Sequence, residues 1–170
     1  KNTPGYITTR SKYDEHKKLP LDRRVGDNQI YSGSDKKIIN NIDKYLTDDL
    51  TDQAINYITR QSTEEHPFFL YMAYNAPHWP MQVAKEYYDK FPEIKDPVRR
   101  TYVAMISNLD ANIGRLIEQL NTTSQYKNTI VFFFLDNGCP KQLGFCDCSS
   151  PLGAGKFSFV DGGTHVPYIV

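Results

Sequence analysis

Two short apolar runs flank one long amphipathic stretch, and this order restricts the folds that the chain can adopt. Residues 68–74 and 129–135 are each of strand length and apolar without alternation, which favours strands buried on both faces of a parallel sheet. Between them, apolar residues recur at helical spacing: Tyr102, Met105, Ile106, Leu109, Ile113, Leu116, Ile117 and Leu120. A strand–helix–strand unit predicts parallel strands joined by a right-handed crossover.

Further elements are predicted on both sides of this unit. From Leu46 onwards, apolar residues again recur at helical spacing. Thr47, Asp48, Asp49 and Asp52 suit the start of that helix, because their oxygens can accept hydrogen bonds from unpaired amides. The shorter predicted elements are a helix over 84–91 and strands over 157–160 and 166–170.

The charge balance and the apolar runs exclude two classes of partner. The chain has 20 basic and 20 acidic side chains among 170 residues, so it has no net field to draw it onto nucleic acid. Its apolar runs are far shorter than the roughly 20 residues that cross a bilayer, so we predict no transmembrane segment. Residues 1–44 are polar and lack periodicity, and we interpret them as a poorly patterned connecting segment.

Three cysteines, Cys139, Cys146 and Cys148, are clustered late in the chain. An odd set can hold one disulfide and one thiol, or it can pair with another segment, and the spacing does not choose between these. The tripeptide Asn121-Thr122-Thr123 is an N-glycosylation sequon, which matters in a secretory protein.

Polar residues follow both predicted strands where each strand ends. His78 lies in a loop between Pro77 and Trp79-Pro80, and Asp136-Asn137 comes directly after the second run. Ligands of open α/β sheets bind at the carboxyl ends of the strands, so we expect these residues at one edge. The carboxylate and amide oxygens of Asp136 and Asn137 suit Ca²⁺ or Mg²⁺, although the same dipeptide before Gly138 is also typical of a turn.

Two further side chains can act on an anion. His78 can donate a proton to a leaving group or bind an oxyanion, although a histidine in a rigid turn can also be structural. Lys156 follows the glycine-rich stretch Gly153-Ala154-Gly155 and can hold sulfate or phosphate as a point charge. Taken alone, it is more typical of a surface lysine.

Five blocks, in this order and spacing, resemble the sulfatases of the alkaline-phosphatase superfamily, with a pattern similar to arylsulfatases of the N-acetylgalactosamine-4-sulfatase type. The blocks are residues 45–54, 67–81, 102–110, 128–138 and 151–167. The resemblance implies that residues 45–170 form the central-to-C-terminal part of a catalytic domain with a mostly parallel central sheet flanked by helices. We expect the N-terminal segment that carries the nucleophile to be absent from the chain.

The resemblance also implies an activity and roles for individual residues. Sulfatases hydrolyse sulfate esters with a formylglycine made from a cysteine and with a bound metal, here expected to be Ca²⁺ rather than Mg²⁺. By position, Asp136 and Asn137 match metal ligands, and His78 and Lys156 match residues that contact sulfate in catalysis. The implied substrates are sulfated carbohydrates or aryl sulfates, and the implied location is lysosomal or secreted.

The chain departs from the family pattern where the nucleophile is concerned. The signatures Cys-x-Pro-Ser-Arg and Cys-x-Ala-x-Arg are absent, and Cys139 is followed directly by Pro140. We therefore expect the formylglycine in the missing N-terminal part of the same domain, which this chain would need as a partner, and we expect no turnover by the chain alone. Two alternatives are a phosphodiesterase or phosphotransferase of the superfamily and a non-catalytic sulfatase-like binding protein.

Overall fold

The computed structural model describes residues 6–8, 30–35, 37–39, 44–146 and 151–170. The chain divides into two compact units, Lys1–Thr123 and Ser124–Val170, which are called the helical unit and the C-terminal unit below.

The helical unit is built on two helices, α2 over Leu46–Gln61 and α4 over Pro97–Thr122, which confirm the two main predicted helices. Helix α4 begins where the Asp96 side chain accepts a hydrogen bond from the Arg99 amide, with proline at a first-turn position that needs no amide donor. Within the described parts of the chain, no helix combines the length and apolar character needed to cross a bilayer.

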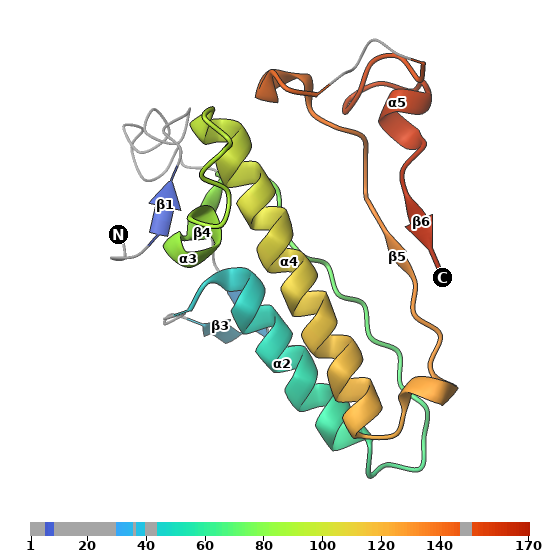
Figure 1. The fold of residues 1–170 in the computed structure, drawn as a ribbon. Helices are drawn as coiled ribbons and strands as arrows, with labels where there is room; N and C mark the ends of the chain where they lie inside the picture. The colour runs from blue at the N-terminus through green and yellow to red at the C-terminus, as the bar shows by residue number, and fades with distance from the viewer. Residues whose placement is uncertain (1–5, 9–29, 36, 40–43, 147–150) are drawn as a thin grey trace. The chain divides into compact units, whose positions relative to one another are not determined.

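Helices α2 and α4 run parallel and side by side (Figure 1). Side-chain hydrogen bonds fix their register, because Asp48 pairs with Asn108 near one end and Thr59 pairs with Gln119 near the other. The apolar residues buried in this unit are Ala54, Ile58, Ala76, Met81, Val83, Ala104, Met105, Leu109 and Leu120. Ile106 was predicted to lie in the buried stripe of α4, and this was wrong, since 42% of it is exposed.

The buried face of α4 is partly polar, which accounts for the position of Ile106. Thr101, Asn108 and Asn112 are almost completely buried together with Met105. These four residues follow a 4–3–4 spacing and so share one side of the helix. Partners on α2 make burial of the asparagines favourable, because buried amide groups must be hydrogen-bonded.

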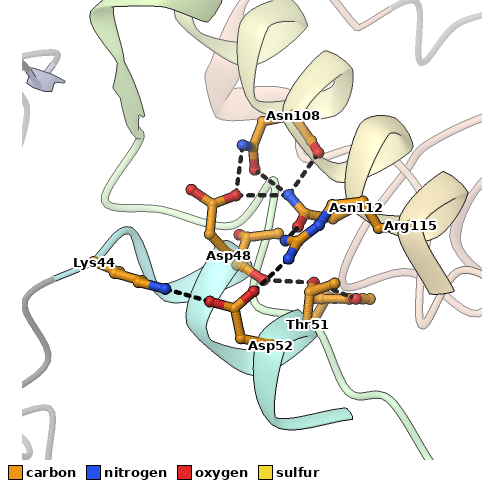
Figure 2. Close-up of polar contacts among 9 residues, drawn as sticks. Lys44, Asp48, Thr51, Asp52, Asn108, Asn112 and Arg115 are labelled. Carbon is orange, nitrogen blue, oxygen red and sulfur yellow. Dashed lines mark hydrogen bonds and ion pairs between the residues drawn. The ribbon is translucent and has the colours of Figure 1, made fainter. Parts of the chain in front are cut away.

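The partners form a polar network between the two helices (Figure 2). The Oδ1 atom of Asp48 accepts hydrogen bonds from Asn108 Nδ2 at 2.9 Å and from Asn112 Nδ2 at 2.7 Å. Arg115 donates to both Asn112 and Asp52, and Lys44 also donates to Asp52. These acidic residues were predicted to serve the helix start, whereas the structure uses Asp48 and Asp52 to join α2 to α4.

The two cations control the acidity of Asp52. Hydrogen bonds from Lys44, and secondarily from Arg115, hold the pKa of the Asp52 carboxyl below its ordinary value of 3.8. Because the pKa of Asp52 is lowered in the folded state, the ionised Asp52 carboxylate and its two cations stabilise the fold at pH values above the ordinary pKa. This contribution is lost as the pH falls through the pKa of the folded state.

Replacing Asp48 with alanine should lower the free energy of unfolding by about 2–3 kcal/mol, because two buried asparagine donors lose a charged acceptor. Urea denaturation followed by circular dichroism measures the change. The matched control is Asp49→Ala, which removes the other carboxylate from the first turn of α2 and should cost about 0.5 kcal/mol. Equal losses in the two variants would show that Asp48 acts only through the helix terminus.

An extended segment returns along α2 in the opposite direction. Tyr57 contacts Phe68 edge to face, Thr51 Oγ1 lies 2.7 Å from Tyr74 Oη, and Tyr45 donates to the Gln82 carbonyl at 2.7 Å. The predicted strand over 68–74 has no strand assignment. Its residues nevertheless alternate between half-buried and exposed, which is the period of extended chain with one face covered.

The described part of the helical unit also contains two short antiparallel strand pairs. Strand β1 (Tyr6–Thr8) pairs with β4 (Gln82–Ala84), and β2 (Ile30–Ser32) pairs with β3 (Lys37–Ile39). Strands β1 to β3 lie within the segment that was interpreted as poorly patterned. Helix α3 (Lys85–Tyr88) follows β4 and confirms part of the helix predicted over 84–91.

The C-terminal unit is a small loop-rich structure. Its elements are η2 (Tyr126–Asn128), β5 (Phe133–Phe134), η3 (Lys141–Leu143), α5 (Asp161–Thr164) and β6 (Tyr168–Ile169). Strands β5 and β6 pair antiparallel. The strand predicted over 129–135 is therefore reduced to two residues with an antiparallel partner. The strand predicted over 157–160 is wrong, because that segment has no strand assignment and begins in a turn.

Candidate functional site

The predicted site residues fall in both units. Asp136, Asn137 and Lys156 lie in the C-terminal unit, and His78 lies in the helical unit. The structure brings the first three onto neighbouring stretches of backbone. It places His78 in the loop that follows the extended segment 68–74.

Backbone hydrogen bonds join the stretch after Asp136 to the stretch that carries Lys156. The Lys156 amide donates to the Cys139 carbonyl at 3.1 Å, and the Gly138 amide donates to the Gly163 carbonyl at 3.0 Å. Asn137 and Asp136 are thus two and three residues, respectively, from Cys139, which makes the backbone contact with Lys156. The sequence motifs around Asp136 and Lys156, predicted to serve one site, lie side by side in this unit.

Glycines permit this close approach. A Cβ atom added to Gly138 would lie well under 3.0 Å from the Gly162 carbonyl oxygen, and one added to Gly162 would lie equally close to the Gly153 carbonyl oxygen. Gly153 has a φ of 67°, in the left-handed region that glycine tolerates without steric cost. Gly138 and Gly162 thus permit close backbone packing, and Gly153 supplies a positive φ.

The chain after Gly153 contains two residues in an unusual backbone conformation. Ala154 has a φ of 28° and Phe157 a φ of 72°, and such values are uncommon for residues with a Cβ. They lie on either side of Gly155 and Lys156, and the Lys156 Nζ atom lies 5.5 Å from the centre of the Phe157 ring. Backbone strain of this kind clusters at functional sites. No residue pattern in the sequence predicts it.

Cys139 and Cys146 form a disulfide with a sequence separation of seven. Of the open alternatives, the structure therefore realises an internal disulfide, while Cys148 lies outside the described residues. The bridge closes a short loop that begins two residues after Asn137. A covalent constraint thus acts on the same stretch of chain as the candidate metal ligands.

The loop around His78 fixes the imidazole tautomer. Both proline peptides that flank it, Ala76-Pro77 and Trp79-Pro80, are cis, and the His78 amide donates to the Asn75 carbonyl at 2.8 Å. The Nδ1 atom of His78 lies 2.6 Å from the Trp79 carbonyl oxygen. A carbonyl oxygen only accepts, so Nδ1 carries the proton, and Nε2 accepts a hydrogen bond in the neutral ring or donates one in the imidazolium.

The segment that leads to His78 is tied to helix α2. Thr51 bonds both the Thr47 carbonyl and the Tyr74 hydroxyl, and Tyr74 is four residues before His78. Burial raises the pKa of the Tyr74 hydroxyl, so it remains a neutral hydrogen-bonding group at physiological pH.

The donor set near Asp136 fits a hard metal ion in kind but supplies only part of a coordination shell. Asp136 offers carboxylate oxygens and Asn137 an amide oxygen, which are ligands that calcium prefers, whereas calcium takes about six to eight oxygens. No cluster of three or more His, Cys, Asp or Glu side chains suited to a metal occurs among the described residues. A complete site would therefore need further ligands.

Comparison with known proteins identifies the family of the chain. The sulfatase family model matches residues 2–170. An uncharacterized sulfatase of Escherichia coli, YdeN, is 37% identical over 128 residues, covering 72% of this chain and 22% of that protein. N-acetylgalactosamine-6-sulfatase of Sus scrofa is 32% identical over 129 residues, covering 73% of this chain and 23% of that protein.

A solved structure is similar over most of the described fold. The crystal structure of Ps i-CgsB in complex with k-i-k-neocarrahexaose aligns with a TM-score of 0.72 and 41% identity, covering 78% of this chain and 29% of that chain. The chain thus spans about a quarter of the proteins that it matches. The neighbours establish an alkaline-phosphatase-like α/β fold, and the chain belongs to the sulfatase family.

Proposed function

We propose that the whole protein is a sulfuric ester hydrolase. The observation that carries this proposal, beyond family membership, is the backbone pairing of Cys139 with Lys156. That pairing brings the backbone of Lys156 next to the stretch that carries Asp136 and Asn137, the two proposed oxygen ligands. A metal ion and a lysine together match the distributed negative charge of a sulfate group.

In this proposal Asp136 and Asn137 hold Ca²⁺, which suits a flexible shell of oxygens better than Mg²⁺ with its strict octahedral geometry. When bound, the metal supplies Lewis-acid polarisation of a sulfate oxygen. Lys156 binds sulfate and stabilises the charge that develops as the ester bond breaks. His78 also contacts the sulfate and, with Nδ1 held by the Trp79 carbonyl, can deliver a proton from Nε2 to the departing alcohol oxygen.

The remaining catalytic parts are proposed to lie outside these 170 residues. They are the other metal ligands and a formylglycine nucleophile made from a cysteine, since none of the three cysteines present occupies a sulfatase signature. We propose that residues 45–170 are the central-to-C-terminal part of the catalytic domain, joined by the connecting segment 1–44. On this view the chain alone does not turn over.

The central sheet of that domain is proposed to be mostly parallel, with strands at 68–74 and 129–135 in the whole protein. Three exposed apolar side chains support this proposal. Phe69 is 88% exposed and Tyr71 is 68% exposed on the side of the extended segment that faces away from α2, and Ile130 is 74% exposed. Apolar side chains in such extended chain are typical of strands that have further sheet and helix packed on them.

Sulfated carbohydrates or aryl sulfates are the proposed substrates. Two relatives support a carbohydrate, because one is named for N-acetylgalactosamine-6-sulfate chemistry and the other was crystallised with a neocarrahexaose. We propose a lysosomal or secreted location and glycosylation at Asn121. The disulfide supports an oxidising compartment, and Asn121 is exposed in the last turn of α4.

The test is an ester-selectivity assay with the full-length protein. We expect release of sulfate from 4-nitrophenyl sulfate and from sulfated oligosaccharides, with little release of phosphate from 4-nitrophenyl phosphate. A calcium chelator should abolish the activity, and added Ca²⁺ should restore it, because the metal polarises the ester. Preference for the phosphate ester would indicate the phosphodiesterase alternative. Tight binding of sulfated sugar without turnover would indicate a binding protein.

A further inference from the structure

The disulfide and the candidate site meet at one residue. Cys139 is bonded covalently to Cys146, and its carbonyl oxygen accepts the hydrogen bond from the Lys156 amide at 3.1 Å. The preceding residue, Gly138, donates to the Gly163 carbonyl at 3.0 Å. The backbone that follows Asp136 and Asn137 is therefore held by one covalent bond and two hydrogen bonds within two residues.

We propose that the Cys139–Cys146 disulfide is a positioning element of this site, and that its reduction loosens Lys156 from the stretch that carries Asp136 and Asn137. The proposal rests on the proposed function in one respect, namely that these residues bind sulfate and metal. It adds a property that the function does not require: the geometry of the site depends on the redox state of this cysteine pair.

The loop closed by the disulfide explains this dependence. Its backbone hydrogen bonds join near neighbours, with the Leu143 amide bonded to Pro140 at 3.2 Å and the Gly144 amide bonded to Lys141 at 3.1 Å. The bridge is the covalent link between the two ends of the loop. Once the disulfide is reduced, the backbone at Cys139 regains conformational freedom. The hydrogen bond from the Lys156 amide to the Cys139 carbonyl must then offset the entropy cost of ordering that backbone.

The reaction itself is a thiol–disulfide exchange with an external dithiol. A thiolate of the dithiol attacks one sulfur of the bridge, which breaks the S–S bond and releases the other cysteine. The second thiol of the dithiol then attacks the sulfur of its own molecule in the mixed disulfide and releases the remaining cysteine. The protein gains two electrons and two protons as the Cys139 and Cys146 thiols, and the dithiol becomes a disulfide. The site is thus expected to be fully formed in an oxidising compartment and loosened in a reducing one.

Hydrogen exchange of the full-length protein, read by mass spectrometry of peptides, tests the proposal. Treatment with dithiothreitol, or the double substitution Cys139→Ser and Cys146→Ser, should accelerate exchange in peptides covering 136–139 and 153–158 by about tenfold or more. Peptides from α4 should keep their exchange rates. In the wild type, reoxidation should restore slow exchange and reverse a rise in KM for sulfate ester, which general unfolding would not do.

The matched control is Cys148→Ser, which removes a cysteine and leaves the Cys139–Cys146 bridge intact, and which should exchange like the wild type. Dithiothreitol should have no further effect on 136–139 and 153–158 in the double variant. Because the wild type is reduced after it has folded, the test stands even if the double variant fails to fold. Unchanged exchange in both peptides on reduction would overturn the proposal.

Exchange rates also separate this inference from the proposed function. If reduction accelerates exchange in a protein that hydrolyses no sulfate ester, the positioning role of the disulfide stands and the proposed activity is wrong. If the protein is an active sulfatase whose exchange and KM are indifferent to reduction, the activity stands and the positioning role is wrong.

Discussion

Replacing Gly162 with alanine should disrupt the C-terminal unit, with a loss of more than about 4 kcal/mol in its free energy of unfolding, an exceptional cost for a single substitution. The added Cβ would come under 3.0 Å from the carbonyl oxygens of both Gly153 and Ala154. Both obstacles are backbone atoms, which cannot rotate aside as a side chain does. The Gly162 amide also donates to the Leu152 carbonyl at 2.9 Å. A shift of the backbone at Gly162 or at Leu152 therefore breaks this hydrogen bond.

Differential scanning calorimetry and hydrogen exchange across 151–165 measure the effect of Gly162→Ala in the full-length protein. The matched control is Gly114→Ala in α4, where an added Cβ would meet nothing within 4 Å. Alanine is the better helix former, so the control should be stabilised by roughly 0.5–1 kcal/mol. A Gly162 variant as stable as the Gly114 variant would show that the close backbone approach does not exist in solution.

The helices were predictable from the sequence, whereas the contacts between them were not. Periodicity identified α2 and α4 because each buries one face, and Met105, Leu109 and Leu120 are buried as expected. The predicted apolar stripe of α4 nevertheless included Ile106. Apolar residues alone were used to locate the buried face, and the buried face of α4 also contains polar residues. The sequence signal for this polar face was the spacing of Asn108 and Asn112, which are four residues apart. In the structure both side chains donate to the carboxylate of Asp48.

The strands were the least predictable elements, and the physical reason is that a strand needs a partner. The residues of 68–74 are extended and alternate in exposure, yet a ladder depends on chain far away in sequence. Local pattern determines that such a segment is apolar and of the right length. The local pattern does not determine which segment lies beside such a strand. The pairing of β5 with β6 was therefore not predicted.

The residues proposed for the candidate site came from the sequence, whereas the contacts around them came from the structure. Asp136, Asn137 and Lys156 were proposed from the chemistry of their side chains and from a resemblance to sulfatases. The choice of Cys139 and Cys146 as the bonded pair required three-dimensional proximity. The positive φ of Phe157 has no counterpart in residue preference.

Replacing Lys156 with alanine in the full-length protein should lower kcat/KM for a sulfate ester by about 10²–10³-fold, the usual cost of removing one group that stabilises transition-state charge. The fold should be unaffected, because the backbone amide at this position, and not the side chain, makes the hydrogen bond to Cys139. Steady-state kinetics measure the loss, and an unchanged melting temperature shows that it arises from chemistry.

Lys141→Ala is the matched control for Lys156→Ala, because it removes the same charge from an exposed position of the same unit. It should retain kcat/KM within about twofold, since an exposed charge is screened by solvent and salt. Lys156→Arg should recover part of the lost rate, because it restores the positive charge. The recovery should be incomplete, because the planar guanidinium does not match a site shaped for a compact ammonium group. If both alanine variants lose activity equally, the effect is one of net charge, and Lys156 does not contact the sulfate.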